Sequence, residues 1–214
     1  MTSLSVSILN MDFGNLEKEI RSIERMSIDS FHMDIMDGHL VDNISFGPAV
    51  VEKVREITDI PIHSHLMISN PERFTKRFFE AGSDTVTIHA ETLEGIDTEN
   101  FFSERTGVSF NPDYPVEEVF PYLDKVGRVL VMSVMAGFGG QEFVESSLKS
   151  IEVLAEKRSK DGHNYIISVD GGVNEETSAR CIDAGADELI VGSYITKSDD
   201  PESKISRLRT LFRP

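Results

Sequence analysis

Short apolar runs alternate with amphipathic stretches along the whole chain. The runs are rich in β-branched or aromatic residues and have the lengths of β-strands, which predicts strands at 4–9, 31–36, 61–67, 85–89, 108–110, 129–134, 165–169 and 188–191. The amphipathic stretches between them carry helix start signals, and proline stands repeatedly near a first helical turn. These stretches predict helices at 15–24, 48–57, 70–80, 115–123, 143–157, 177–184 and 200–211, with a weaker one around 98–104.

The alternation of eight strands with about eight helices indicates the α/β class of fold. It predicts parallel βα units that close into a (β/α)8 TIM barrel. An open doubly wound sheet is the structural alternative. No Pro/Gly/Ser-rich linker and no low-complexity block divides the chain, so we expect residues 1–214 to form one domain.

The charge of the chain narrows the range of partners. Its 214 residues include 21 Lys and Arg against 37 Asp and Glu, a net charge of −16 at pH 7. Such a field repels polyanions, so we expect neither nucleic acid nor a membrane as a partner. A phosphorylated ligand must then be held locally, by groups such as the backbone N–H groups at helix N-termini.

Two features of the sequence predict a cytoplasmic location. Cys181 is the only cysteine and has no disulfide partner within the chain, and the first residues lack the charged and apolar regions of a signal peptide. No stretch approaches the roughly 18 to 20 apolar residues that span a bilayer.

Chemistry-bearing side chains gather at the ends of predicted strands. The period of two along 31–36 puts His32 and Asp34 on one face, which in a barrel points inward near the C-terminal mouth. His63 and His65 share a face of the next strand, one as a candidate ligand and the other as its support, and Asp170 ends the seventh strand. The alternatives are a neutral core histidine at His32 and a simple Asp-Gly-Gly turn after Asp170, but a buried carboxylate is costly without a cation or donors.

Two imidazoles and two carboxylates from three strands make a divalent-metal site with nitrogen and oxygen ligands. Zn²⁺, Fe²⁺, Mn²⁺ or Co²⁺ would suit these ligands, and no cysteine thiolate is among them. Carboxylate oxygens beside such an ion are suited to moving protons, because the ion stabilises the enediolate that forms when a proton leaves the carbon next to a carbonyl.

Three glycine clusters follow the last three strands and suit an anion. They are Gly137-Phe138-Gly139-Gly140, Gly171-Gly172 and Gly192-Ser193. Phosphate sites of these barrels commonly lie at the loops after strands seven and eight, although each cluster alone is compatible with an ordinary βα turn. The glycines within 135–141 also suit a mobile lid.

The sequence resembles the ribulose-phosphate 3-epimerase family over essentially its whole length. The matching pieces run in the family's order: Ser7-Ile8-Leu9, His32-Met33-Asp34-Ile35-Met36-Asp37-Gly38-His39, His65-Leu66-Met67, His89-Ala90-Glu91, Asn111-Pro112, Gly137-Phe138-Gly139-Gly140-Gln141, Val169-Asp170-Gly171-Gly172 and Gly192-Ser193. The resemblance implies a barrel of the ribulose-phosphate-binding type and an isomerase that inverts C3 of a ketose phosphate. It also implies one divalent metal ion, no organic cofactor and a homo-oligomer.

The resemblance further implies roles for individual residues. His32, Asp34, His65 and Asp170 would bind the metal, and Asp34 and Asp170 would be the acid/base pair. Ser7 and His65 would contact the sugar. The phosphate would be held by Gly137, Phe138, Gly139, Gly140, Gly171, Gly172, Gly192 and Ser193, and the intermediate would be shielded by Met36, Met67 and Met132.

Four positions depart from the family's usual residues. His63 stands where the family has Asp, Asp42 and Ala136 stand where it has Pro, and Tyr114 stands where Thr is common. We expect proline at 136 to favour closure of the lid, if the backbone there accepts it. The predicted reaction is D-ribulose 5-phosphate to D-xylulose 5-phosphate. The alternatives are epimerisation of another ketose phosphate, such as D-allulose 6-phosphate, and a non-catalytic sugar-phosphate sensor, against which the complete acid and histidine set argues.

Overall fold

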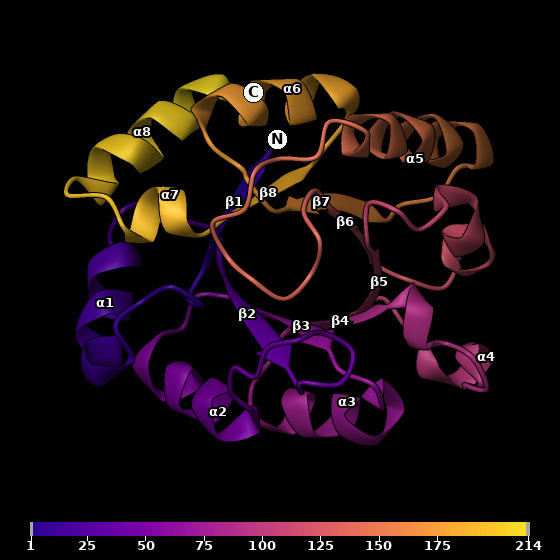
Figure 1. Ribbon diagram of the computed structural model, residues 1–214, viewed down its shortest axis with the longest axis horizontal. Helices are drawn as coiled ribbons and strands as arrows, with labels where there is room; N and C mark the ends of the chain where they lie inside the picture. Colours follow the sequence, from indigo (N-terminus) through magenta and orange to yellow (C-terminus); the bar gives the residue numbers. More distant parts are fainter. Residues whose placement is uncertain (1, 213–214) are drawn as a thin grey trace.

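Eight parallel strands form a closed barrel in chain order, β1 to β8, and β8 pairs with β1 (Figure 1). The computed structural model describes residues 2–212. The strands are β1 (Ser3–Ser7), β2 (Ser30–Met36), β3 (Ile62–Met67), β4 (Thr85–His89), β5 (Thr106–Phe110), β6 (Arg128–Met132), β7 (Ile166–Asp170) and β8 (Glu188–Val191). The predicted barrel is confirmed, and the open doubly wound sheet is wrong.

Helices surround the barrel (Figure 1). They are η1 (Phe13–Asn15), α1 (Leu16–Ile23), α2 (Pro48–Ile57), α3 (Pro71–Glu80), η2 (Ala90–Thr92), α4 (Thr98–Phe101), η3 (Val116–Tyr122), α5 (Ser147–Asp161), α6 (Glu175–Ala184), α7 (Ser193–Thr196) and α8 (Pro201–Leu211). A search of the described residues finds no helix with the length and apolar character needed to cross a membrane.

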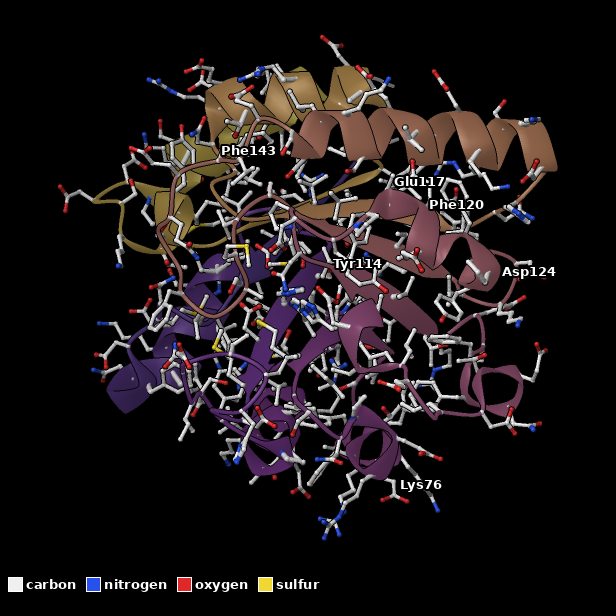
Figure 2. All side chains as sticks on the ribbon, turned by 45° about the vertical axis from the view of Figure 1, so that its right-hand side comes forward. Lys76, Tyr114, Glu117, Phe120, Asp124 and Phe143 are labelled. Atoms are coloured by element: carbon white, nitrogen blue, oxygen red, sulfur yellow. The ribbon has the colours of Figure 1, made fainter. Side chains whose placement is uncertain are left out.

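Two predicted helices differ most from the structure. The stretch 115–123 forms the 3-10 helix η3, which contains Pro121. Proline has no N–H to donate and disfavours a regular α-helix. Helix α5 begins at Ser147 rather than at 143, because the preceding loop bonds elsewhere: the Val144 N–H donates to the Ser133 carbonyl over 2.8 Å. Figure 2 shows Phe143 on this loop.

The alternation along β2 separates the core from the site. Phe31, Met33 and Ile35 belong to the main hydrophobic core, whereas His32 and Asp34 lie on the opposite face and are also buried. Both faces of a barrel strand are covered, by helices outside and by the other strands inside. The inward face therefore holds polar groups away from bulk water.

A buried ion pair closes the N-terminal end of the barrel. The Arg128 guanidinium on β6 contacts the Glu188 carboxylate on β8, and the Ser168 hydroxyl donates to the same carboxylate over 2.7 Å. Burial lowers the pKa of Arg128 to about 10, which leaves it positively charged at neutral pH. His63 lies beside this pair, with Nδ1 3.3 Å from Glu188 Oε1.

Replacing Glu188 by Gln is expected to lower the free energy of unfolding by about 3–5 kcal/mol, because Arg128 is left as an uncompensated buried charge. The control E56Q breaks the exposed Lys53–Glu56 pair and should cost at most about 0.5 kcal/mol. The double variant R128L/E188L should regain most of the loss. Denaturant unfolding measures all three, and an E188Q loss no larger than that of E56Q contradicts the prediction.

Candidate active site

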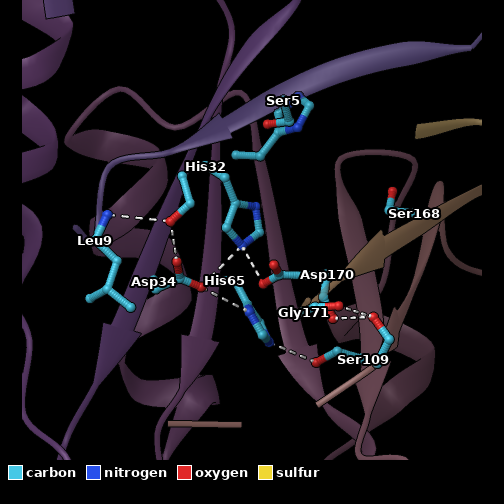
Figure 3. Close-up of polar contacts among 12 residues, drawn as sticks. Ser5, Leu9, His32, Asp34, His65, Ser109, Ser168, Asp170 and Gly171 are labelled. Carbon is cyan, nitrogen blue, oxygen red and sulfur yellow. Dashed lines mark hydrogen bonds and ion pairs between the residues drawn. The ribbon is translucent and has the colours of Figure 1, made fainter. Parts of the chain in front are cut away.

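Four side chains that could hold a metal ion lie together inside the barrel (Figure 3). His32 and Asp34 come from β2, His65 from β3 and Asp170 from the end of β7. The strand register places His65 beside Asp34. One ligand atom from each of the four residues lies within 4.8 Å of all the others, so the structure brings together the predicted set.

The geometry of the four residues fits a divalent cation. His32 Nε2 lies 3.2 Å from Asp34 Oδ1 and 3.7 Å from Asp170 Oδ2, and His65 Nδ1 lies 3.4 Å from Asp34 Oδ1. Within the described residues, the buried nitrogens His32 Nε2 and His65 Nδ1 have no hydrogen-bond partner. Unpartnered imidazole nitrogens aimed at carboxylates are the donor set that Zn²⁺ and similar ions bind.

Burial and mutual charge separate the pKa values of the two carboxylates. Burial acts to raise the pKa of Asp34, but His32 and His65 together outweigh it, and the pKa lies below its usual range. Burial and the nearby charge of Asp34 raise the pKa of Asp170 to about 7. Without a cation at neutral pH, Asp34 is therefore ionised, whereas Asp170 holds a proton more readily than Asp34 does.

The two histidines also differ. Burial lowers the pKa of His65 to about 4, so its ring is neutral at pH 7. Burial also acts to lower the pKa of His32, but the charges of Asp34 and Asp170 outweigh it and raise the pKa. A neutral ring is the form that binds a metal, so His65 is already in the ligating state.

A cavity of about 480 Å³ opens directly above the carboxylates of Asp34 and Asp170. Ser7 also lines it and donates its hydroxyl to Asp34 Oδ2 over 2.7 Å. The other lining residues include three methionines and all three predicted glycine clusters: Met36, Met67, Met132, Gly137, Phe138, Gly139, Gly140, Gly171, Gly172, Gly192 and Ser193. Every predicted substrate-contacting residue except the buried His65 therefore borders this space.

The turn after β7 requires glycine. Gly171 and Gly172 have φ values of +113° and +62°, and a Cβ on Gly171 would lie 2.8 Å from the Val134 nitrogen. The start of α6 differs from the general expectation that helix N-termini hold the anion, because the Asn174 side chain accepts from the N–H groups of Glu176 and Thr177. An anion here must use the glycine loops rather than the capped end of α6.

The loop from Met135 to Gln141 crosses the mouth of the barrel (Figure 1) and is tied down at several points. The Ala136 N–H donates to Asn111 Oδ1 over 2.9 Å, and the Asn43 amide donates to the Gly137 carbonyl over 2.7 Å. The Gln141 amide donates back to the Met135 and Phe138 carbonyls. The glycine-rich segment is therefore held over the cavity by side-chain amides.

The hydrogen bond at Ala136 reverses the expected effect of proline there. Proline lacks the N–H that binds Asn111, so Ala136→Pro is expected to loosen the loop, raise KM for a phosphorylated ketose a few-fold and speed protease cleavage beside Phe138. Steady-state kinetics and limited proteolysis measure these effects, with Ala136→Ser as a control that keeps the N–H. A lower KM with slower cleavage would show that the ring outweighs the lost bond.

Some functional groups were not predicted from the sequence. Asn10, Asn174 and Lys197 line the cavity, although single polar residues on loops carry no spacing signal. His63 lies outside the four-residue group, beside Glu188. His89 and Glu91 belong to the family motif His89-Ala90-Glu91 at the end of β4. Catalytic groups of this fold converge at the ends of strands, so this position could have indicated a role for both residues.

A TIM barrel with a buried acid and histidine cluster under a glycine-lined cavity defines a candidate metal-dependent enzyme for small anionic ligands. Residues 3–196 match the Ribulose-phosphate 3 epimerase family. The chain is 40% identical to ribulose-phosphate 3-epimerase of Bacillus subtilis, over 98% of this chain and 99% of that protein. It is 37% identical to ribulose-phosphate 3-epimerase of Methanocaldococcus jannaschii, over 98% and 90%.

The chain belongs to the ribulose-phosphate 3-epimerase family. The predicted family and the predicted enzyme class, an isomerase, are confirmed. Among solved structures, orotidine 5'-phosphate decarboxylase from Pyrococcus horikoshii superposes with a TM-score of 0.70 at 15% identity, over 99% of each chain. This second likeness concerns the fold alone and agrees with a barrel of the ribulose-phosphate-binding type.

Proposed function

We propose that this epimerase family member inverts C3 of D-ribulose 5-phosphate to give D-xylulose 5-phosphate, with Asp34 and Asp170 as the acid/base pair. One observation carries the proposal: the two carboxylates come from β2 and β7, face the same cavity, and have pKa values displaced in opposite directions. Paired groups with separated pKa values are typical of an acid and its partner base.

Each carboxylate serves one face of the substrate. Asp34, which is ionised, takes the proton from C3 of ribulose 5-phosphate, and the electron pair of that bond forms the enediolate with C2 and its oxygen. Asp170, whose pKa is about 7, gives its proton to the opposite face of C3, and the C2 carbonyl re-forms. Asp34 ends protonated and Asp170 ionised, so the pair is set for the reverse reaction.

His32, Asp34, His65 and Asp170 would together hold one divalent ion per chain, which could be Zn²⁺, Fe²⁺, Mn²⁺ or Co²⁺. Such an ion supplies positive charge beside the oxygens that become anionic. Ser7 holds the Asp34 carboxylate through its hydroxyl. The thioether side chains of Met36, Met67 and Met132 line the cavity and exclude water from the reacting carbons.

Backbone groups of the three glycine clusters would bind the phosphate, assisted by Lys197, the one cationic side chain among the residues that line the cavity. Lys197→Gln is expected to raise KM roughly tenfold and to change kcat little, because a charge-assisted hydrogen bond contributes about 1.5 kcal/mol or more. Lys160→Gln, an exposed change at the end of α5, is the matched control. An unchanged KM in Lys197→Gln would remove this lysine from the phosphate site.

The positions of the residues that depart from the family's usual ones favour the five-carbon substrate. Asp42, Tyr114 and Ala136 are not among the residues that line the cavity, and Figure 2 shows Tyr114 on the loop that follows β5. These three departures therefore place no unusual side chain in the lining of the cavity. Two alternatives remain. One is epimerisation of another ketose phosphate, such as D-allulose 6-phosphate, and the other is a non-catalytic sugar-phosphate sensor.

A substrate panel in deuterium oxide tests the proposal. The metal-loaded protein is given D-ribulose 5-phosphate and, separately, D-allulose 6-phosphate, and NMR follows both epimer formation and deuterium incorporation at C3. Faster turnover of the pentose phosphate with deuterium at C3 is expected. Preference for the hexose phosphate would favour the alternative epimerase, and binding without exchange would favour the sensor.

Assembly and location complete the proposal. A homo-oligomer is proposed because the family resemblance implies one, and light scattering at several protein concentrations tests it. A cytoplasmic location is proposed because Cys181 is buried and forms no disulfide, as suits a reducing compartment.

A further inference from the structure

A continuous chain of hydrogen bonds links the candidate metal ligand His65 to the loop over the cavity. His65 Nε2 lies 2.9 Å from His89 Nε2, and His89 Nδ1 lies 3.2 Å from Glu91 Oε2. Glu91 Oε1 accepts from both the backbone and the side-chain N–H of Asn111, each over 3.0 Å. Asn111 Oδ1 then accepts from the Ala136 N–H.

The two histidine rings are built for a direct contact. Both are fully buried, and their planes differ by 16° with the ring centres 5.0 Å apart. Side chains held this tightly lose little further freedom when the bond forms. The ring orientation of His65 is therefore set by His89 as well as by packing.

The carboxylate fixes the direction of every bond in the chain. An ionised carboxylate only accepts hydrogen bonds, so His89 must carry its proton on Nδ1 and donate it to Glu91. When His65 binds a cation through Nδ1, its hydrogen lies on Nε2, and the facing Nε2 atom of His89, 2.9 Å away, accepts it. With its proton there, neutral His65 presents a bare Nδ1 toward Asp34, the nitrogen that has no hydrogen-bond partner.

We propose that His89 and Glu91 are positioning residues that hold His65 in the one tautomer able to bind the metal through Nδ1, and that Asn111 ties the same carboxylate to the loop at Ala136. The inference rests on the proposed function, because it concerns a ligand of the proposed metal. Partners that donate or accept behind a metal-binding histidine fix its tautomer and ring orientation.

Ser109 does not account for the same effect. Its Oγ lies 3.2 Å from His65 Nε2 (Figure 3), but a hydroxyl rotates and serves either tautomer as donor or acceptor. Only the path through His89 ends at a group that cannot donate. Ser109→Ala is therefore a useful comparison, and we expect it to change metal affinity less than about threefold.

Glu91→Gln is the central test. The single acceptor oxygen of Gln is claimed by the two N–H groups of Asn111, so the amide NH₂ faces His89 and favours the opposite tautomer along the chain. The dissociation constant for Co²⁺ alone, measured on metal-free protein by competition with a fluorescent chelator, is expected to rise about 10- to 100-fold. Glu117→Gln, an exposed change on η3 (Figure 2), should leave it unchanged.

Two variants at His89 keep the test informative if Glu91→Gln folds poorly. His89→Leu removes both bonds and is expected to weaken Co²⁺ binding by a similar factor. His89→Gln can still accept from His65 and donate to Glu91, so it should recover affinity to within a few-fold of wild type. Asn111→Ala should instead speed cleavage of the loop beside Phe138 while changing Co²⁺ affinity little.

Two outcomes overturn the inference, and they are distinguishable. If the wild-type protein binds Co²⁺ but folded Glu91→Gln and His89→Leu bind it within threefold of wild type, the positioning role is wrong and the proposed function stands. If the wild-type protein binds no divalent ion, the proposed metal site fails and this inference fails with it.

Discussion

Asp170→Asn and Asp34→Asn are each expected to lower kcat for epimerisation by about 10²- to 10⁴-fold. Each carboxylate serves one face of the same carbon, so neither can replace the other, and water is a poor substitute for a positioned acid or base. An amide neither takes nor gives the proton. The change keeps the size of the side chain, and the barrel should remain folded because neither aspartate belongs to its main hydrophobic core.

Proton exchange distinguishes the two roles more sharply than turnover does. Asp170→Asn retains Asp34, so ribulose 5-phosphate should still exchange its C3 hydrogen with deuterium oxide while xylulose 5-phosphate does not. Asp34→Asn should show the reverse. Both carboxylates are also candidate metal ligands, so the assays require saturating metal and a measured metal content for each variant.

Asp113→Asn supplies the control for these variants. Asp113 is exposed on the loop after β5 and does not line the cavity, so its removal should leave kcat unchanged. Either site variant would contradict the two-base assignment if it kept more than about a tenth of the wild-type kcat with its metal bound. Exchange from both epimers in one variant would point to a single base that reaches both faces.

The features that the sequence predicted are those that follow from local periodicity. The period of two along β2 is enough to separate Phe31 and Met33 from His32 and Asp34, because a strand buried on both faces has no other way to arrange them. The barrel then brings strand ends together at one mouth. These two facts predict one site for His32, Asp34, Asp170 and one of the pair His63 and His65, and the family resemblance selects His65 from that pair.

The features that were not predicted depend on contacts between distant segments. Asn111 anchors Ala136 only because the ends of β5 and β6 are adjacent, and no local pattern encodes that bond. The Asn174 cap of α6 uses N–H groups that would otherwise be free for an anion. His63 shares a strand face with His65, but the partner that claims it, Glu188, is 125 residues away in sequence. Contacts between side chains from distant strands therefore determine which of these residues belong to the site.

Removal of the metal is expected to lower activity by about 10²-fold or more, because several kcal/mol of charge stabilisation are lost in the transition state. The His32, Asp34, His65 and Asp170 group is the candidate site for the ion. Extended chelation followed by elemental analysis gives the metal-free protein, and readdition of Co²⁺, Mn²⁺, Fe²⁺ or Zn²⁺ should restore activity. Fully active protein that contains no metal would contradict the prediction. Circular dichroism of the metal-free form should be unchanged, since the hydrophobic core does not include these four residues.

The affinity for that metal is expected to depend on pH in a defined direction. In the metal-free protein the pKa of His32 is raised, and a histidine binds a metal only as the neutral ring, so a cation must displace the proton of His32. Affinity should therefore increase as the pH rises, by up to about tenfold per pH unit while His32 holds that proton, and should level off once the ring is neutral. Titration calorimetry in buffers of different ionisation enthalpy counts the protons. An affinity that is independent of pH between 5.5 and 8 would show that metal binding displaces no proton from His32, which contradicts the prediction.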